Sequence, residues 1–209
     1  MREEAQTKRK RRGAKVRGCQ VCEKISFTMM RVFAFSVYTG SAIRIARKMK
    51  ESQHEPLAEQ MGRCVATWLL DATPFAIEHY DALIPIPQHW FRRLAVRYNQ
   101  SETLANGIAS HFGCSVEDRW VQRTRWTPKQ GMKTIAERRE NMHRAFEIPS
   151  KYSRRIQGRR FLLVDDVMTS GATLDQAAWA LKQRGAVLVD AVVFARGLGV
   201  AKTVARQSV

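Results

Sequence analysis

The sequence predicts an α/β protein with a mostly parallel central sheet and helices on both faces. From residue 81 to the end, short apolar segments alternate with helical patterns, an order typical of βαβ units. Right-handed crossovers between parallel strands would then cover both faces of the sheet with helices. Hydrophobic residues make up 44% of the 209 residues, which is enough for the core of one domain.

The first elements are expected within residues 31–72. The stretch RVFAFSVY, residues 31–38, alternates and is rich in aromatic and β-branched residues, so it predicts a strand. Thr39 and Gly40 turn the chain, and Ser41 is the expected N-cap of the next helix. Residues 56–72 predict a second helix, because their apolar side chains fall near one face.

The second half of the chain carries the βαβ pattern. Residues 81–87, DALIPIP, predict a short buried strand; a basic loop follows, and Ser101 is expected to cap a helix that runs to about Ser110. The polar, basic residues 120–146 are expected to begin as a mobile loop and to end in a helix around residues 135–143. The remaining elements are a strand at 160–166, a helix at 173–184 that ends near Gly185, and a strand at 186–195.

The chain is strongly basic, with 36 Lys and Arg against 19 Asp and Glu and a net charge of +17. Such a balance favours polyanionic partners, namely nucleic acid, an anionic membrane surface or phosphorylated small molecules. Residues 1–18 carry +6 and almost no apolar side chain, so they predict a disordered tail that either contacts nucleic acid or is merely solvated. The rest of the chain carries +11 and is basic in its own right.

A cytoplasmic protein is expected. No apolar run approaches the roughly 18 residues of a membrane-spanning helix, and the basic N-terminus is not followed by the apolar region of a secretory signal. The cysteines are therefore expected to be reduced. Cys64 and Cys114 are interpreted as packing residues, and only Cys19 and Cys22 have the metal-ligand spacing C-x-x-C.

The stretch VDDVMTSGAT, residues 164–173, indicates a ligand site. Asp165 and Asp166 follow a buried strand, so they should emerge at the carboxyl edge of the sheet, where ligands bind. The next residues open a helix, whose free N–H groups and dipole favour an anion. The expected anion-binding loop is Thr169, Ser170, Gly171, Ala172 and Thr173. A ribose 5-phosphate would fit both parts, with its 2- and 3-hydroxyls on the acids and its phosphate in the loop.

Two other interpretations of this stretch stay open. Thr173 or Ser170 could be a plain N-cap, with Asp165 and Asp166 as solvated loop acids. Alternatively, the acid pair could bind a metal ion. A Walker loop is excluded, because the sequence G-x-x-x-x-G-K-[ST] does not occur.

The same stretch closely resembles the signature with which type I phosphoribosyltransferases bind phosphoribosyl pyrophosphate (PRPP). That signature has four apolar residues, an acid pair, two apolar residues and a Thr/Ser-Gly-x-Thr loop. Other stretches resemble the ComF-like (competence protein F) branch of this family, over about Cys19 to Arg196. They are Tyr38-Thr39-Gly40 with the later Lys50, residues 81–93, the RYNQS element at 97–101, and the segment from Arg123 to Phe146. Val96 and Arg97 depart from the pattern, since Arg-Gly is usual there.

The resemblance implies roles for particular residues. It implies catalytic residues Asp165, Asp166, Arg92 and Arg138, and PRPP binding by the acid pair, the loop 169–173, Lys50, Arg93 and Arg97. Mg²⁺ would accompany PRPP, and residues 123–141 would form a mobile lid that excludes water. The arginines at 92, 93 and 97 either stabilise the leaving pyrophosphate or belong to a solvated basic loop. Lys50 either lies near the pyrophosphate or only ends a helix.

ComF-like proteins typically carry two C-x-x-C pairs that form a zinc ribbon. Only the pair at Cys19 and Cys22 is present here, and structural zinc needs four ligands, so zinc binding is not expected. Residues 19–30 are interpreted as a degenerate ribbon between the tail and a phosphoribosyltransferase-like domain at 31–209.

Two functions follow as hypotheses. The first is a PRPP-binding protein of the ComF family, linked to natural competence and DNA uptake, that transfers ribosyl 5-phosphate to a nitrogen acceptor and releases pyrophosphate. It would be a glycosyltransferase if active. The alternative is a non-catalytic DNA-uptake accessory that binds single-stranded DNA or competence machinery. Its basis is the positive charge and three tryptophans among arginines, Trp90, Trp120 and Trp126.

Overall fold

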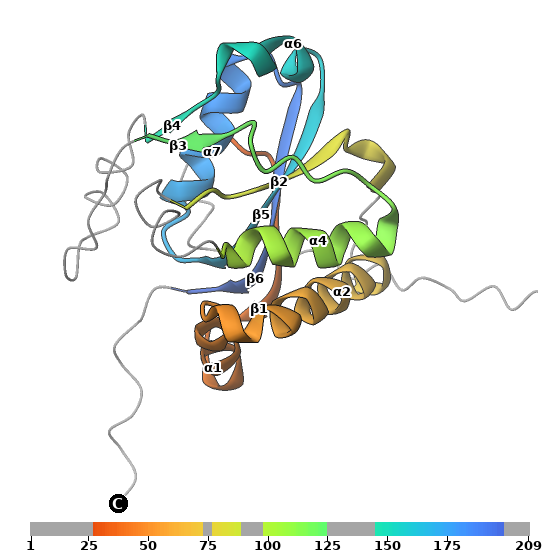
Figure 1. Cartoon of the computed structure of the whole chain (residues 1–209), viewed down its shortest axis with the longest axis vertical. Helices are drawn as coiled ribbons and strands as arrows, with labels where there is room; N and C mark the ends of the chain where they lie inside the picture. The colour runs from red at the N-terminus through yellow and green to blue at the C-terminus, as the bar shows by residue number, and fades with distance from the viewer. Residues whose placement is uncertain (1–26, 73–76, 89–97, 125–144, 199–209) are drawn as a thin grey trace, which may run out of the picture.

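The computed structural model describes residues 27–72, 77–88, 98–124 and 145–198. A four-stranded sheet forms its centre, with the strand order β1-β6-β5-β2 and every neighbouring pair parallel (Figure 1). The strands are β1 (Val32–Val37), β2 (Ala82–Pro85), β5 (Arg160–Met168) and β6 (Leu188–Arg196). The predicted parallel sheet is confirmed.

Helices cover both faces of this sheet. On one face lie α1 (Gly40–Lys48), α2 (Glu55–Ala72) and α4 (Gln100–Phe112), and on the other lie α6 (Ser153–Ile156) and α7 (Ala172–Gln183). Short 3₁₀ turns occupy Ser52–His54, Ile77–His79 and Ser150–Tyr152. Among the described residues, no helix combines the length and apolar character needed to cross a membrane.

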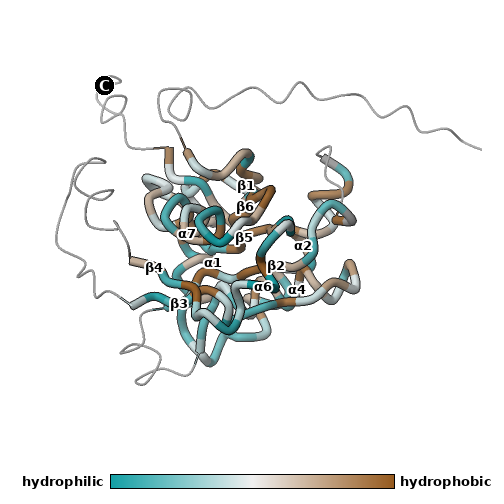
Figure 2. Tube along the Cα trace, turned by 90° about the horizontal axis from the view of Figure 1, so that it is seen from above, coloured by the Kyte–Doolittle hydropathy of each residue, from teal (hydrophilic) through white to brown (hydrophobic). Residues whose placement is uncertain are grey.

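Strand β5 shows why the sheet separates two cores. Successive side chains of a strand point to opposite faces. Accordingly, Phe161 and Leu163 join the core under α7, whereas Leu162 and Val164 join the core under α2 and α4. A strand covered on both sides is apolar at successive positions, which explains the continuous apolar run. In Figure 2 the central strands are largely brown, the colour of hydrophobic residues.

Several predicted boundaries were wrong. The residue before α1 is Thr39 and not Ser41, whose hydroxyl instead accepts a hydrogen bond from Arg44. Asn99, not Ser101, caps α4: its side chain accepts the N–H of Ser101 at 3.2 Å. In both helices the predicted N-cap lies two residues after the observed one. A residue type that can cap a helix often occurs at several neighbouring positions, and the sequence does not show at which of them the helical backbone begins.

Two features differ more substantially from the predictions. Strand β5 continues to Met168, two residues beyond the predicted end at 166, so the acid pair lies inside the strand, as the predicted range has it, and not at its last two positions. The sequence also did not predict the small antiparallel pair of β3 (Gln122–Arg123) and β4 (Phe146–Glu147). The predicted helix at 135–143, most of the predicted lid and the tail at 1–18 lie outside the described residues.

Candidate functional site

The acid pair lies near the carboxyl end of β5 and is almost fully buried. Asp165 is 9% exposed and Asp166 is 6% exposed. Each carboxylate accepts the N–H of the next residue: Asp165 Oδ1 at 2.9 Å from Asp166 N, and Asp166 Oδ1 at 2.8 Å from Val167 N. Burial contradicts the interpretation of these residues as solvated loop acids.

Asp165 is held from the side by helix α4. The hydroxyl of Ser101 donates to Asp165 Oδ1 at 2.9 Å, and Ser101 is itself buried. Burial raises the pKa of Asp165 to about 8, and the neighbouring charge of Asp166 adds to the shift, while the Ser101 hydrogen bond opposes it. The structure therefore favours a proton on Asp165 near neutral pH.

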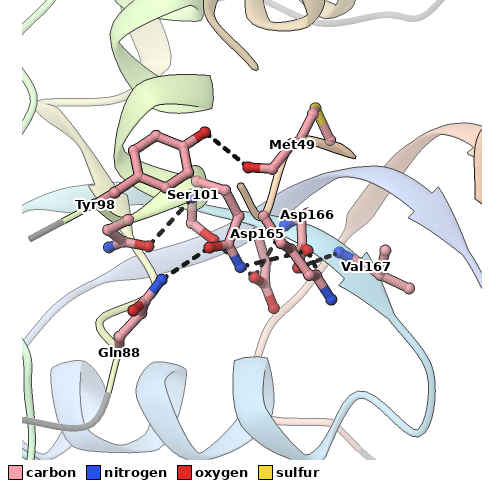
Figure 3. Close-up of polar contacts among 10 residues, drawn as sticks. Met49, Gln88, Tyr98, Ser101, Asp165, Asp166 and Val167 are labelled. Carbon is pink, nitrogen blue, oxygen red and sulfur yellow. Dashed lines mark hydrogen bonds and ion pairs between the residues drawn. The ribbon is translucent and has the colours of Figure 1, made fainter. Parts of the chain in front are cut away.

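Asp166 is the carboxylate with a cationic partner. Lys50 Nζ lies 3.2 Å from Asp166 Oδ2, and the Lys50 side chain is 36% exposed. Gln100 Nε2 lies 3.4 Å from the same oxygen, and Gln100 Oε1 in turn accepts Gln88 Nε2 at 2.8 Å. Figure 3 shows this chain of side chains from Gln88 toward the acid pair.

The elements around α4 fix these donors in place. Asn99 caps α4 and also donates from Nδ2 to the carbonyl of Ile86 at 3.3 Å, which ties the helix start to the end of β2. Tyr98 donates from its hydroxyl to the carbonyl of Met49 at 2.7 Å, next to Lys50. Three segments far apart in the sequence thus meet at the acid pair.

The predicted anion-binding loop follows β5 directly. Gly171 has φ +79°, in the left-handed region, and α7 begins at Ala172. A Cβ at Gly171 would lie 2.5 Å from Met168 Cε and 2.8 Å from Phe27 Cε1, so a larger residue would displace these side chains and strain the backbone. Ser170 is buried, and its Oγ lies 3.4 Å from the N–H of Ala172, whereas Thr169 is exposed and Thr173 is half-buried.

The interpretation of this loop as an ordinary capped helix start is not supported. The residue at the N-cap position of α7 is Gly171, which has no side chain to cap the helix. Ser170, one of the two candidate caps, lies one residue earlier, and among the described residues its Oγ accepts only the N–H of Ala172. The N–H groups of the first helical turn that no side chain caps are suited to an anion.

Residues just before β1 lie against the same helix. The backbone N–H of Thr28 donates to Asp175 Oδ1 in α7 at 2.6 Å, and Met29 is 4% exposed in the core under α7. Residues 27–29 thus pack on the domain, whereas the Met30 side chain is exposed; all four residues belong to the predicted ribbon remnant at 19–30. The rest of that segment, with Cys19 and Cys22, lies outside the described residues.

The structure brings together only part of the predicted set. Lys50, Asp165, Asp166 and the loop 169–173 lie at one end of the sheet. The predicted arginines lie outside the described residues; these are Arg92, Arg93, Arg97 and Arg138. Of the described residues, no group of three His, Cys, Asp or Glu side chains is placed to hold a metal ion.

Four side chains of the site were not predicted as such. Gln100 and Ser101 belong to the RYNQS element, so the resemblance could have indicated them. Arg196 lies next to the start of the loop, where its guanidinium donates hydrogen bonds to the carbonyl oxygens of Met168 and Gly197. Arg123 is half-buried with its guanidinium 5.9 Å from the Phe146 ring centroid; burial lowers its pKa, while the charge of Asp165 acts in the opposite direction.

The fold and this loop geometry agree with a comparison to protein families. The family model described as "Phosphoribosyl transferase domain" matches residues 99–205, from the cap of α4 to beyond β6. The chain belongs to the phosphoribosyl transferase domain family.

Within that family the chain is ComF-like. It is 27% identical over 187 residues to "DNA utilization protein YhgH" of Escherichia coli O157:H7, a match that covers 86% of this chain and 78% of that one. It is 30% identical over 105 residues to "Competence protein F" of Haemophilus influenzae, a match that covers 50% of this chain and 45% of that one.

Solved structures show more distant likeness. Glutamine PRPP amidotransferase from B. subtilis, complexed with ADP and GMP, has a TM-score of 0.43 and 18% identity, over 65% of this chain and 25% of that one. The protein TT1426 from Thermus thermophilus has a TM-score of 0.39 and 15% identity, over 71% of this chain and 85% of that one.

Proposed function

We propose that this chain binds PRPP, with the ribose hydroxyls on Asp165 and Asp166 and the 5-phosphate in the loop 169–173. One observation carries the proposal: two buried acids lie near the carboxyl end of a parallel strand, and a short loop joins that strand to a helix whose N-cap residue is a glycine. Carboxylates accept hydrogen bonds from vicinal hydroxyls, and helix N-termini favour phosphate.

The reaction that such a site would serve is ribosyl transfer. The bond from C1 to the pyrophosphate oxygen breaks, a bond from C1 to a nitrogen acceptor forms, and the acceptor's proton leaves to solvent or a base. Lys50, half-exposed at the edge of the acid pair, can hold the ligand's negative charge near Asp166. The proposal also keeps Arg92, Arg93, Arg97 and Arg138 as cations for the leaving pyrophosphate.

The carboxylates of Asp165 and Asp166 suit Mg²⁺ only if the ion binds together with the phosphates of the ligand. Mg²⁺ commonly binds one or two carboxylates together with substrate phosphates, rather than a cage made by the protein alone. Asp165 and Asp166 could supply these carboxylate ligands, and Mg²⁺ would neutralise charge on the pyrophosphate. The proposal includes a cytoplasmic location, which the free thiols of Cys64 and Cys114 fit.

Calorimetry with PRPP and Mg²⁺ tests the binding. Asp166→Asn should weaken PRPP binding at least about tenfold, because a buried charged acceptor of the ligand is lost. Asp71→Asn, which changes an exposed acid in α2, is the matched control and should bind as the wild type does. Absence of heat from folded wild-type protein, or unchanged affinity in Asp166→Asn, contradicts the proposal. Release of pyrophosphate with a panel of bases and amines then tests transfer.

A role in DNA handling is a second candidate function. The names of the relatives, "DNA utilization protein YhgH" and "Competence protein F", motivate it. Exposed cations also gather at the amino end of β5, the end of the molecule where α6 lies in Figure 1; they are Lys151, Arg154, Arg155, Arg159, Arg160 and Arg184. Of these, Arg160 pairs with Asp81 at 3.8 Å.

The structure corrects one part of the DNA hypothesis. Trp120 is 4% exposed and stacks on Tyr152 with ring centroids 6.0 Å apart, so it is a core residue and offers no face to a base. Trp90 and Trp126 lie outside the described residues. Titration of a labelled single strand at two salt concentrations tests the candidate: Arg154→Glu with Arg155→Glu should weaken binding and flatten its salt dependence. Equal binding by this variant would exclude that surface.

A further inference from the structure

The side chain of Arg196 lies directly behind the loop that follows β5. Arg196 ends β6 and is 7% exposed. Its Nη1 donates to the carbonyl oxygens of Met168 at 3.0 Å and Gly197 at 2.8 Å, and also to that of Thr169. The backbone adds a further tie, since Gly197 N donates to Met168 O at 2.8 Å. One guanidinium therefore holds two consecutive peptide groups at the start of the loop.

These bonds determine how the loop presents its backbone. A trans peptide is planar, with its C=O and N–H pointing in opposite directions. When the carbonyls of Met168 and Thr169 point toward Arg196, the N–H groups of Thr169 and Ser170 point away from it. The hydrogen bonds of Arg196 thus orient the two peptide groups between Met168 and Ser170, with their N–H groups on the side away from the guanidinium.

Arg196 also brings a positive charge behind the loop. A buried guanidinium is surrounded by a lower dielectric than water, so its attraction for a nearby anion is stronger than at the surface. The other ionisable groups of this region are Asp165 and Asp166 in β5, Asp175 in α7 and Lys50 after α1; Tyr38, whose N–H donates to Arg196 O, is a titratable group directly after β1. Carboxylates near the loop disfavour an anion there, even with a proton on Asp165, which makes a balancing cation more important.

We propose that Arg196 is a positioning residue for the anion-binding loop and that it makes the loop selective for a phosphate monoester as the dianion. The inference rests on the proposed function, in which this loop holds the 5-phosphate. The guanidinium acts in two ways: its hydrogen bonds orient the loop, and its charge interacts about twice as strongly with a dianion as with a monoanion. The matching ligand class is a terminal phosphate monoester, such as that of a pentose 5-phosphate.

Binding of ribose 5-phosphate at pH 5.0 and pH 7.5 tests the inference with the full chain. The second ionisation of a phosphate monoester falls near pH 6, so the ligand changes from monoanion to dianion over this interval. Wild-type affinity should rise by up to about tenfold between the two pH values, because the fraction of dianion rises by about that factor. In Arg196→Gln the rise should shrink to about threefold or less, and affinity at pH 7.5 should fall at least about tenfold.

Two further variants separate the possible explanations. Arg196→Lys keeps the charge on a shorter side chain that lacks the planar guanidinium, so the pH-dependent rise should persist while affinity falls. Arg119→Gln, which changes an exposed arginine between α4 and β3, is the matched control and should leave both quantities unchanged. Arg196→Lys also serves as the test if Arg196→Gln does not fold.

The outcomes distinguish the inference from the function on which it rests. If wild-type protein binds neither ribose 5-phosphate nor PRPP, both are wrong. If the wild type binds but Arg196→Gln keeps the wild-type affinity, or loses affinity equally at both pH values, only the inference is wrong. Equal loss would indicate a general structural role, which changes folding but not the preference for the dianion.

Discussion

Ser101 Oγ donates a hydrogen bond to Asp165 Oδ1 across 2.9 Å, and this bond joins the start of helix α4 to the carboxyl end of strand β5. Both residues are buried, so the bond is shielded from water. Gln100, the preceding residue of α4, points its amide nitrogen to Asp166 at 3.4 Å. The orientation of both acids thus depends on where α4 begins.

Ser101→Ala should destabilise the folded protein by about 1–3 kcal/mol, because a buried acceptor loses its donor. It should also raise the pKa of Asp165 further, since the hydroxyl is one of the groups that lower it. Ser101→Thr keeps the hydroxyl and should lose less stability. Ser110→Ala, at the exposed end of α4, is the control. Urea unfolding measures all three variants, and equal midpoints for Ser101→Ala and the wild type would contradict the prediction.

The free energy of unfolding should fall as the pH rises from 5 to 7.5. Burial raises the pKa of Asp165 to about 8 from an ordinary 3.8, so in this interval the folded protein holds a proton that the unfolded chain has released. The contribution of Asp165 should amount to at least about 1 kcal/mol over the interval. It should be absent in Asp165→Asn, whose amide does not titrate. Urea midpoints at the two pH values check this, and an equal pH dependence in the two proteins would contradict it.

Lys50→Gln should affect ligand binding more than folding. The Lys50 side chain is 36% exposed, and such ion pairs contribute about 0–1 kcal/mol to stability. PRPP affinity should nevertheless fall by about tenfold, because the ligand loses a cation at the acid pair. Lys48→Gln, which changes an exposed lysine at the end of α1, is the control. Calorimetry and thermal melts of both variants measure the two effects, and equal PRPP affinities would show that Lys50 only balances Asp166.

Gly107→Ala should destabilise the protein by about 1–3 kcal/mol or more, because α2 and α4 cross without room for a side chain. A Cβ at Gly107 would lie 2.2 Å from Glu59 O and 3.0 Å from Gly62 Cα. Since α4 carries Gln100 and Ser101, ligand affinity should fall as well. Asn106→Ala changes the neighbouring, exposed position of the same helix and is the control. Urea unfolding and calorimetry measure both variants, and unchanged stability in Gly107→Ala would mean that the helices can move apart freely.

Asp190→Asn should destabilise the fold by about 1–3 kcal/mol without changing ligand affinity, because a buried carboxylate loses its charge-assisted hydrogen bonds with the partly exposed Arg31. Asp190 is fully buried in β6 and accepts the Nε and Nη2 of Arg31 at 2.9 and 2.7 Å and the hydroxyl of Tyr80 at 2.7 Å. These bonds lie nearer the amino end of β6, away from the acid pair. Urea unfolding measures the loss, and PRPP affinity of the folded protein is the control; a changed affinity would show that the two ends of the sheet are coupled.

The strands were predictable because their signal is local. The apolar run before Asp165 and the alternation in residues 31–38 each indicate a strand within one short stretch of sequence. The caps of α1 and α4 were misplaced, because several residues near each helix start could have capped it. The pair of β3 and β4 was missed, since two-residue strands have too few positions to show a period.

In the candidate site, too, the features that lie within one short stretch of sequence were predictable, and those that join distant segments were not. The sequence alone determined the acid pair, the small-residue loop and the parallel sheet that carries them, because these are contiguous patterns with a direct link to backbone geometry. Only the tertiary structure decided that the acids are buried, that Ser101 and Lys50 hold them, and that Arg196 lies behind the loop. The physical reason is that burial and hydrogen bonding depend on which segments meet in space. Ser101 lies 64 residues from Asp165 in the chain, and Lys50 is farther still from Asp166, so no local pattern could bring them together.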